Sequence, residues 1–472
     1  MNLPISFIER TKQLLGELEW TEFVNSLEEN SPTSIRINME KAKLHQLDLA
    51  PENAKSIPWC NTGIYLNNRP NFTFDPLFHA GIYYVQEASS MFISEVIKEY
   101  IPTTKEVIAL DLCAAPGGKT TLLKNYLPKN SLLIANEIVN KRAQILSENL
   151  QKWGDADVIV TNNKSEDFTR FNSLFDLILA DVPCSGEGMF RKDDVAIDEW
   201  SVENVNTCWK RQREIVENIW PTLKPGGLFI YSTCTYNREE NEDNIQWIID
   251  EFGAESLKIE IDDSWGIMNG FSETSHAYRF MPHHTKGEGF FISVLRKPGY
   301  ISEKQIEKVK NKKKKDKKSS PHKNNFSTCL EWVLDADKYD QILVGENLYL
   351  FPSQYASIFE EMQKAKIHFM HIGLPLATIK GKTMIPNHAL ALSNQLNSLA
   401  FEKVDIDYTT AISYLRKEAV TLPATTSIGY ILLTYRNIPL GFVKNIGNRS
   451  NNLYPQEWRI RSQYIPSELM LL

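Results

Sequence analysis

The sequence contains no apolar run long enough to cross a bilayer, which takes roughly 18 residues or more. Its start, MNLPISFIERTKQ, lacks the basic segment and apolar core of a signal peptide. CxxC pairs and disulfide-like spacings are also missing among the six cysteines, Cys60, Cys113, Cys184, Cys208, Cys234 and Cys329. We therefore expect a cytoplasmic, monomeric protein with free thiols, and neither a membrane partner nor a bound metal.

The glycine patterns of two common nucleotide sites are absent as well. In ALDLCAAPGGKTT (109–121), a P-loop would need glycine where Cys113 stands, and a dinucleotide fingerprint would need GxGxxG. Residues 113–119 instead form a loop of small residues, which we expect to open a helix at the carboxyl end of a strand. Its backbone amides can hold an anion, here a carboxylate, and Lys119 adds positive charge.

Acidic residues outnumber basic ones overall, but lysines are concentrated in one segment. The net charge is −7, yet residues 304–323 hold ten lysines against Glu307 and Asp316. Such a run is typical of a solvated linker, and it can also serve as a tether that seeks phosphates. The two interpretations are compatible.

Apolar stretches alternate with amphipathic ones in the middle of the chain. The predicted strands are 107–111, 132–137, 157–162, 175–181 and 227–234, with 289–297 at a sheet edge, and predicted helices include 141–153 and 210–220. Strands that are apolar throughout are typical of a parallel sheet covered on both faces by helices. The pattern predicts a doubly wound α/β domain.

Two polar positions follow the second and third predicted strands. Glu137 ends the second strand, where an acid can accept hydrogen bonds from both hydroxyls of a ribose. Asn163 follows the third strand, where an amide can bond an adenine edge. A nucleoside that carries a carboxylate but no phosphate matches S-adenosylmethionine, although other nucleoside cofactors use similar folds.

Two cysteines follow the fourth and fifth predicted strands. Asp181 and Cys184 lie in ADVPCSGEG (180–188), and Cys234 lies in LFIYSTCTY (228–236). A lone strand-end cysteine is usually a small buried hydrophobe. Two of them with an aspartate, beside a methyl-donor loop, indicate reactivity instead. A thiolate that adds to carbon 6 of cytosine makes carbon 5 nucleophilic, and an acid at ring nitrogen 3 favours the addition.

These segments resemble the NOL1/NOP2/sun family of RNA 5-methylcytosine methyltransferases. The matching segments are YVQEASSMF (84–92), DLCAAPGGKT (111–120), ADVPCSGEG (180–188), YSTCTY (231–236) and GEGFF (287–291). The resemblance implies a Rossmann-like class I methyltransferase domain with a mostly parallel seven-stranded sheet. It implies that Cys234 is the nucleophile, that Cys184 serves product release, and that Asp181 contacts the target base. The implied S-adenosylmethionine contacts are Cys113, Ala114, Ala115, Pro116, Gly117, Gly118, Lys119, Glu137, Asn163 and Asp181; the family more often has aspartate at position 163.

The flanking regions suggest a larger architecture. We predict an α+β RNA-binding module (1–75), the methyltransferase domain (76–298), the lysine-rich linker (299–326), a first C-terminal α+β module (327–395) and a PUA-like module (396–472). The last segment resembles the C-terminal module of RsmF-type bacterial members.

The flanking modules also contain candidate RNA contacts. In the last segment, the aromatic residues are expected mainly in the core: Tyr430, Tyr435, Phe442, Tyr454 and Trp458. Its basic residues are candidate phosphate contacts: Arg436, Lys444, Arg449, Arg459 and Arg461. Arg36, in SIRIN, is a candidate RNA contact, or else part of a surface ion pair.

The RsmF-type resemblance implies 16S ribosomal RNA, or the 30S subunit, as the partner. Methylation of tRNA by the same chemistry and a non-catalytic assembly factor remain alternatives, and a small-molecule methyltransferase fits the flanks poorly. The tripeptide ENV in SVENVNT (201–207) is typical of DNA cytosine methyltransferases. In those enzymes the nucleophile is the cysteine of a Pro-Cys pair, which here would be Cys184. The tripeptide lies in a predicted helix, and we interpret it as chance.

Overall fold

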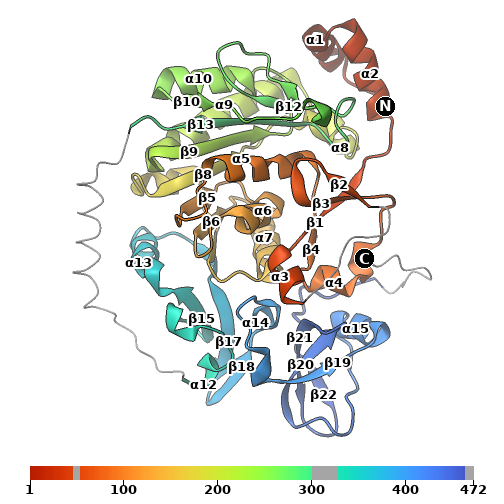
Figure 1. Ribbon diagram of the computed structural model, residues 1–472, viewed down its shortest axis with the longest axis vertical. Helices are drawn as coiled ribbons and strands as arrows, with labels where there is room; N and C mark the ends of the chain where they lie inside the picture. Colours follow the sequence, from red (N-terminus) through yellow and green to blue (C-terminus); the bar gives the residue numbers. More distant parts are fainter. Residues whose placement is uncertain (46–53, 300–326, 463–472) are drawn as a thin grey trace.

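The computed structural model describes residues 1–45, 54–299 and 327–462 (Figure 1). Two helices, α1 (Ile5–Leu15) and α2 (Glu17–Leu27), begin the chain. A small antiparallel sheet follows, in the order β2 (Lys55–Ile57), β3 (Cys60–Leu66), β1 (Thr33–Ile37), β4 (Tyr83–Val85), with α3 (Met39–Leu44) and α4 (Pro76–His79) beside it. β4 follows residue 75, where we expected the first module to end, and it pairs antiparallel with β1 of this sheet.

A ten-stranded sheet forms the centre of the molecule. Its order is β11 (Met268–Asn269), β12 (Tyr278–Phe280), β13 (Phe290–Arg296), β9 (Leu223–Thr233), β8 (Phe175–Asp181), β5 (Ile108–Asp111), β6 (Leu132–Asn136), β7 (Val158–Thr161), β16 (Phe369–Ile372), with β10 (Glu255–Leu257) paired to β13. The five strands from β9 to β7 run parallel. The predicted count of seven strands is therefore wrong, and β13 is not an edge strand. The additional strands are short or come from the C-terminal region, so their residues gave no periodic signal.

Helices cover both faces of this sheet, as the apolar strands predicted. Leu133, Leu177 and Ile230 pack in the cluster that includes α5 (Ile93–Tyr100), α6 (Gly118–Tyr126) and α7 (Asn140–Trp153). The neighbouring positions Ile134 and Ile178 point to the opposite face. That face is covered by α9 (Val202–Ile219), α10 (Glu242–Phe252) and α13 (Ala356–Lys364), while the short α8 (Asp194–Glu199) precedes α9.

Two further sheets follow in the C-terminal region. The first has the order β14 (Tyr339–Val344), β15 (Asn347–Pro352), β17 (Leu374–Lys380), β18 (Thr383–Pro386), accompanied by α12 (Ser327–Leu330) and α14 (His388–Leu392). The second has the order β19 (Glu402–Asp405), β20 (Gly429–Tyr435), β21 (Ile438–Asn445), β22 (Ser450–Asn452), with α15 (Tyr408–Leu415). Between β15 and β17 the chain leaves the first of these sheets to form β16, which pairs antiparallel with β7 of the central sheet.

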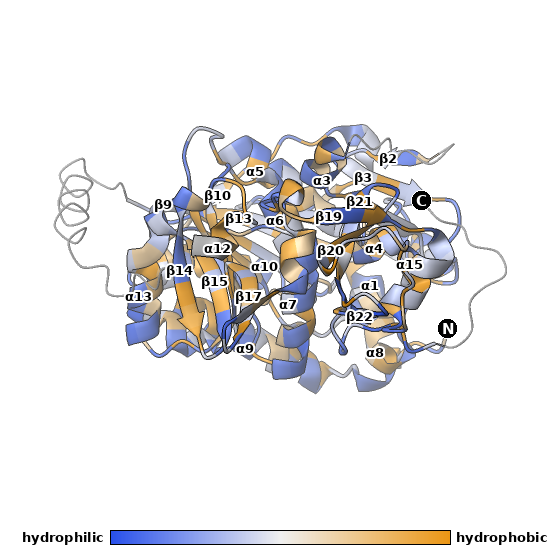
Figure 2. Cartoon of the chain, turned by 90° about the horizontal axis from the view of Figure 1, so that it is seen from below, coloured by the Kyte–Doolittle hydropathy of each residue, from blue (hydrophilic) through white to orange (hydrophobic). Residues whose placement is uncertain are grey.

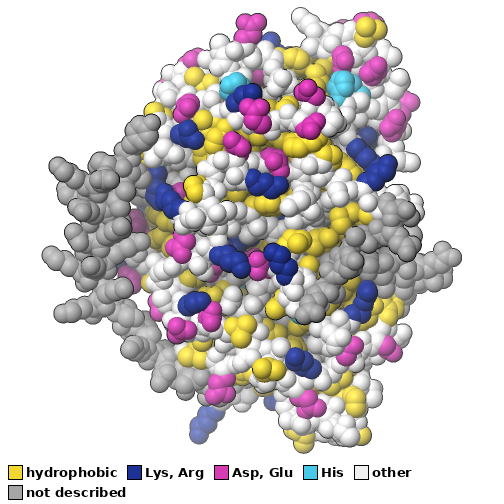
Figure 3. Space-filling model, in the orientation of Figure 1, with side chains coloured by type: hydrophobic (Ala, Val, Ile, Leu, Met, Phe, Trp, Pro, Cys, Tyr) yellow, Lys and Arg dark blue, Asp and Glu magenta, His cyan; other side chains and the backbone are white. Residues whose placement is uncertain are grey.

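Apolar residues are concentrated on the strands, and surface helices such as α13 carry both kinds of residue (Figure 2). On the face seen in Figure 3, lysine and arginine side chains are interspersed with aspartate and glutamate and do not form a single block. No helix in the described part of the chain combines the length and apolar character needed to span a membrane.

Candidate functional site

A loop of small residues joins β5 to α6 at the carboxyl edge of the sheet, as predicted. Gly117 precedes α6 with φ 115°, a left-handed conformation that favours glycine, and no side chain of the described residues caps this helix end. The first amides of α6 are therefore available to an anion. Below the loop, Thr120 Oγ1 donates to Asp111 Oδ2 over 2.7 Å, while Asp111 Oδ1 is buried without a hydrogen-bond partner among the described residues. Burial raises the pKa of Asp111 to about 7.

Glu137 directly follows β6 at the same edge. Its side chain is almost completely buried: Oε1 accepts from the Val139 amide over 2.9 Å, and Oε2 lies 3.3 Å from the Arg142 guanidinium. A carboxylate has about four lone-pair positions, so acceptor capacity remains for hydroxyl groups.

Asn163 makes contacts that the sequence did not suggest. Its Nδ2 donates to the His368 carbonyl and its Oδ1 accepts from the His368 amide, both over 3.1 Å. The side chain thus holds the segment that leads into β16. One donor and one acceptor position of the amide remain for any other ligand.

The two predicted reactive cysteines lie side by side. β8 and β9 are parallel neighbours with Asp181 opposite Ser232, so the loops that follow them begin together. The Sγ atoms of Cys184 and Cys234 are 3.2 Å apart, and the Cys234 amide donates to Cys184 Sγ over 3.3 Å. The hydrogen bond with Cys234, together with burial, raises the pKa of the Cys184 thiol.

Asp181 connects the cysteine loops to the loop before α6. Its Oδ2 is 2.9 Å from Lys119 Nζ, and its Oδ1 accepts from Ser232 Oγ over 2.7 Å. Burial lowers the pKa of Lys119, but the charge of Asp181 and its hydrogen bond outweigh this effect, so the pKa lies above its ordinary value. Lys119 also interacts electrostatically with Cys234. A cation, a carboxylate and two thiols therefore meet at one edge of the sheet.

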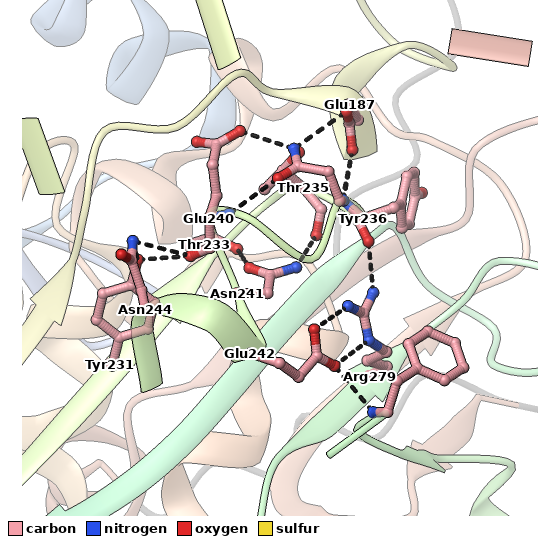
Figure 4. A network of polar contacts seen from close by, with 12 residues as sticks. Glu187, Tyr231, Thr233, Thr235, Tyr236, Glu240, Asn241, Glu242, Asn244 and Arg279 are labelled. Carbon is pink, nitrogen blue, oxygen red and sulfur yellow. Dashed lines mark hydrogen bonds and ion pairs between the residues drawn. The ribbon is translucent and has the colours of Figure 1, made fainter. Parts of the chain in front are cut away.

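A buried polar network, part of which is drawn in Figure 4, connects the two cysteine loops. Glu240 accepts hydrogen bonds from the Ser185 amide (3.0 Å), Gln212 Nε2 (2.6 Å) and Asn237 Nδ2 (2.8 Å). Because Ser185 follows Cys184 and Asn237 lies three residues beyond Cys234, this carboxylate joins the two loops.

Glu187 makes a second connection between the same loops. Its Oε2 accepts from the amides of Tyr236 and Asn237 over 2.7 and 2.9 Å (Figure 4). Next to it, the Gly188 amide donates to the Cys234 carbonyl over 2.8 Å, and a Cβ on Gly188 would lie 2.8 Å from that oxygen. Only glycine allows this approach.

Sequence reasoning missed most of this network. Glu240 and Glu242 lie in NREENEDN (237–244), an acidic run that looks solvated, yet both side chains are buried and Glu242 pairs with Arg279. The feature of the sequence that could have indicated their role is their position shortly after Cys234. The ENV tripeptide lies inside α9, as predicted.

The flanking predictions have mixed outcomes. Arg36 is fully buried: it donates to Gln86 Oε1 over 2.8 Å and stacks 4.6 Å above the Trp153 ring, so both surface interpretations are wrong. Phe442 and Tyr454 are core residues, whereas Tyr430, Tyr435 and Trp458 are half-buried. Of the five candidate phosphate contacts, Lys444 is half-buried and Arg436, Arg449, Arg459 and Arg461 are exposed.

The chain is similar to known proteins over most of its length. Family models match for 16S rRNA methyltransferase RsmB/F (residues 100–296), the N-terminal domain of 16S rRNA methyltransferase RsmF (3–88) and the methyltransferase RsmF PUA domain (401–460). Ribosomal RNA small subunit methyltransferase F of Aeromonas hydrophila is 30% identical over 96% of this chain and 97% of its own length. The protein of the same name from Shewanella loihica is 30% identical over 94% of this chain and 93% of its own length. A solved methyltransferase homologue from Pyrococcus horikoshii is 30% identical, covers 62% of this chain and 94% of its own, and has a TM-score of 0.51.

Proposed function

This chain belongs to the 16S rRNA methyltransferase RsmB/F family, and we propose that it methylates carbon 5 of a cytosine in 16S ribosomal RNA. The observation that carries the proposal is the pair of thiols, 3.2 Å apart, beside Asp181 and Lys119. The enzyme acts as a monomer on this RNA, either free or within the 30S subunit.

The residues at the sheet edge fit S-adenosylmethionine, which supplies the methyl group when it is bound. The uncapped start of α6 suits the cofactor's carboxylate, and Glu137 suits its ribose hydroxyls. The loop from Cys113 to Lys119, with Asp181, borders this site. Asn163 contributes to the adenine side through the part of its amide that His368 leaves available.

Cys234 is the nucleophile. Its thiolate adds to carbon 6 of the cytosine, which makes carbon 5 nucleophilic, and Asp181, as the aspartic acid, assists by donating its proton to ring nitrogen 3. Two features favour Cys234 over Cys184. Lys119 places a positive charge near Cys234, whereas the hydrogen bond with Cys234 and burial raise the pKa of the Cys184 thiol, which makes Cys184 the weaker candidate.

Cys184 serves the release step. After transfer, carbon 5 must lose its proton while the bond between carbon 6 and the Cys234 sulfur breaks. The Cys184 thiol, 3.2 Å from Cys234 Sγ, can pass its proton to the departing sulfur, and the Cys184 thiolate so formed can accept the proton from carbon 5. Without it, the adduct should break down slowly.

Trapping of the covalent adduct tests these roles. RNA that contains 5-azacytidine should form a stable adduct with the wild-type chain, no adduct with Cys234→Ala, and a persistent adduct with Cys184→Ala even on unmodified RNA. Cys208→Ala, which changes a buried cysteine in α9, should behave like the wild type. An adduct that is lost in Cys184→Ala but retained in Cys234→Ala would reverse the assignment.

Bisulfite sequencing tests the substrate. Cells without this protein should lose a methylated cytosine in 16S ribosomal RNA, and the wild-type gene should restore it while Cys234→Ala should not. Loss confined to tRNA would contradict the proposed substrate. Unchanged methylation, with RNA binding retained, would indicate a non-catalytic assembly factor.

A further inference from the structure

Three side chains with metal-binding groups converge far from the cysteines. Glu19 lies on α2, and His283 and His284 lie in the turn after β12. Their ligand atoms all lie within 4.8 Å of one another. The Nε2 atoms of His283 and His284 lie 2.9 and 2.7 Å from the same oxygen, Glu19 Oε2.

The charge of this cluster suits a divalent cation. Glu22, one turn further along α2, also interacts electrostatically with His283. The carboxylates of Glu19 and Glu22 thus place negative charge beside the two imidazoles, which suits a divalent ion.

The geometry requires little adjustment. Zinc bonds to imidazole nitrogen and carboxylate oxygen are about 2.0–2.2 Å long, so ligand atoms in a tetrahedron lie roughly 3.3 Å apart. The contacts at Glu19 Oε2 are 2.9 and 2.7 Å, so each would lengthen by about half an ångström around an ion. Glu19 and His284 are partly exposed, with side-chain exposures of 39% and 30%, which allows the ion to enter and keep a water ligand.

We infer that Glu19, His283 and His284 form a divalent metal site with the ligand preference of zinc. Two imidazoles with a carboxylate favour zinc over magnesium or calcium, which prefer oxygen ligands. Hydrogen bonds alone can also hold the three side chains in this arrangement, and the experiment below separates the two explanations.

The site would fasten the N-terminal helices onto the catalytic domain. On α2, Phe23 packs edge-on against Tyr236 with ring centroids 5.1 Å apart, and Tyr236 lies two residues after Cys234. On the other side, the turn of His283 and His284 leads into the GEGFF segment, where Glu288 accepts from Ser31 Oγ over 2.5 Å. A metal ion here is therefore structural: it holds α2 beside the cysteine loop and takes no part in the chemistry.

Titration with zinc alone tests the inference. The full-length chain, stripped with a chelator and dialysed, should bind one zinc ion in calorimetry, and zinc should raise its melting temperature. Glu19→Gln, which keeps an oxygen for both imidazole N–H groups, should lower the affinity at least tenfold, as should His284→Gln. His276→Gln, which changes an exposed histidine outside the cluster, should leave binding unchanged.

Cobalt substitution tests whether cysteines are among the ligands. Cobalt in the proposed site should show visible d–d bands without a sulfur-to-cobalt charge-transfer band, because all ligands are nitrogen or oxygen. Melting temperatures in chelator check that both variants are folded. Lack of one-site binding in the wild type, equal affinity in Glu19→Gln and His284→Gln, or a thiolate band would each overturn the inference.

Discussion

The carboxylate of Glu240 accepts hydrogen bonds from groups on three segments: the loop after β8, the loop after β9, and α9. It is completely buried. Burial raises its pKa from 4.5 to about 7, although hydrogen bonds from Ser185 and Asn237 act in the opposite direction. The group therefore costs the folded state free energy when it is ionised, while its hydrogen bonds keep the two cysteine loops together.

This balance predicts a specific pH dependence of stability. Between pH 4.5 and 7 the unfolded chain loses the Glu240 proton but the folded chain keeps it, so the group's stabilising contribution, complete below pH 4.5, is lost as the pH rises through 7. In Glu240→Gln this contribution is absent, and the difference in unfolding free energy between the two proteins should change by up to roughly 3 kcal/mol across the window. Denaturant unfolding at several pH values measures it. Asp111 and Asp155, whose pKa values are also raised, are present in both proteins, so their contribution cancels in the difference. A difference in unfolding free energy that does not change with pH would contradict the prediction.

Residues in strand-end motifs could be predicted from the sequence, and residues that act through burial could not. Cys184, Cys234 and Asp181 follow apolar strands, and the parallel order of β8 and β9 brings them together. Arg36 looks like a surface arginine in SIRIN, and only the packing of Trp153 against it shows otherwise. We expected no metal site because of the spacing of the cysteines. That spacing gives no information about Glu19 and His283, which are 264 positions apart in the sequence.

Among the elements, β16 was the least predictable. It consists of only four residues and is inserted between strands of another sheet, yet it pairs with β7 at the edge of the central sheet. The segment before it is also held by Asn163, whose amide bonds both main-chain groups of His368. The central strands, by contrast, are apolar throughout and were located from the sequence.

Asn163→Ala should loosen this attachment. The His368 amide would lose its acceptor and the carbonyl one of its donors, at a cost of about 1–3 kcal/mol. Hydrogen exchange at His368 and through β16 should accelerate, and affinity for S-adenosylmethionine should fall as well if the remaining positions of the amide contact adenine. Asn172→Ala, at an exposed position, serves as the control. Unchanged exchange in β16 would show that the strand pairing alone holds this segment.

At the scale of the whole molecule, the C-terminal sheets share cores with the rest of the chain. Ile35 and Leu77 of the N-terminal region belong to the same buried cluster as Leu415 and Leu433 of the last module. Tyr408 Oη also donates to the Phe74 carbonyl over 3.0 Å, and Tyr454 Oη lies 3.2 Å from His79 Nδ1. These contacts join the first and last parts of the sequence. The last module is therefore packed against the N-terminal region and is not attached through its linker alone.

A single core substitution should therefore weaken both ends of the chain together. Leu433 is fully buried, and Leu433→Ala should cost about 2–5 kcal/mol through lost burial and the cavity that remains. Because its cluster includes Ile35 of β1, hydrogen exchange should accelerate in β1 as well as in β20, within one cooperative unfolding transition. Ile428→Ala, at an exposed position, should change neither. If β20 alone were affected, the last module would unfold independently, and the cluster shared with the N-terminal sheet would contribute little to the stability of either part.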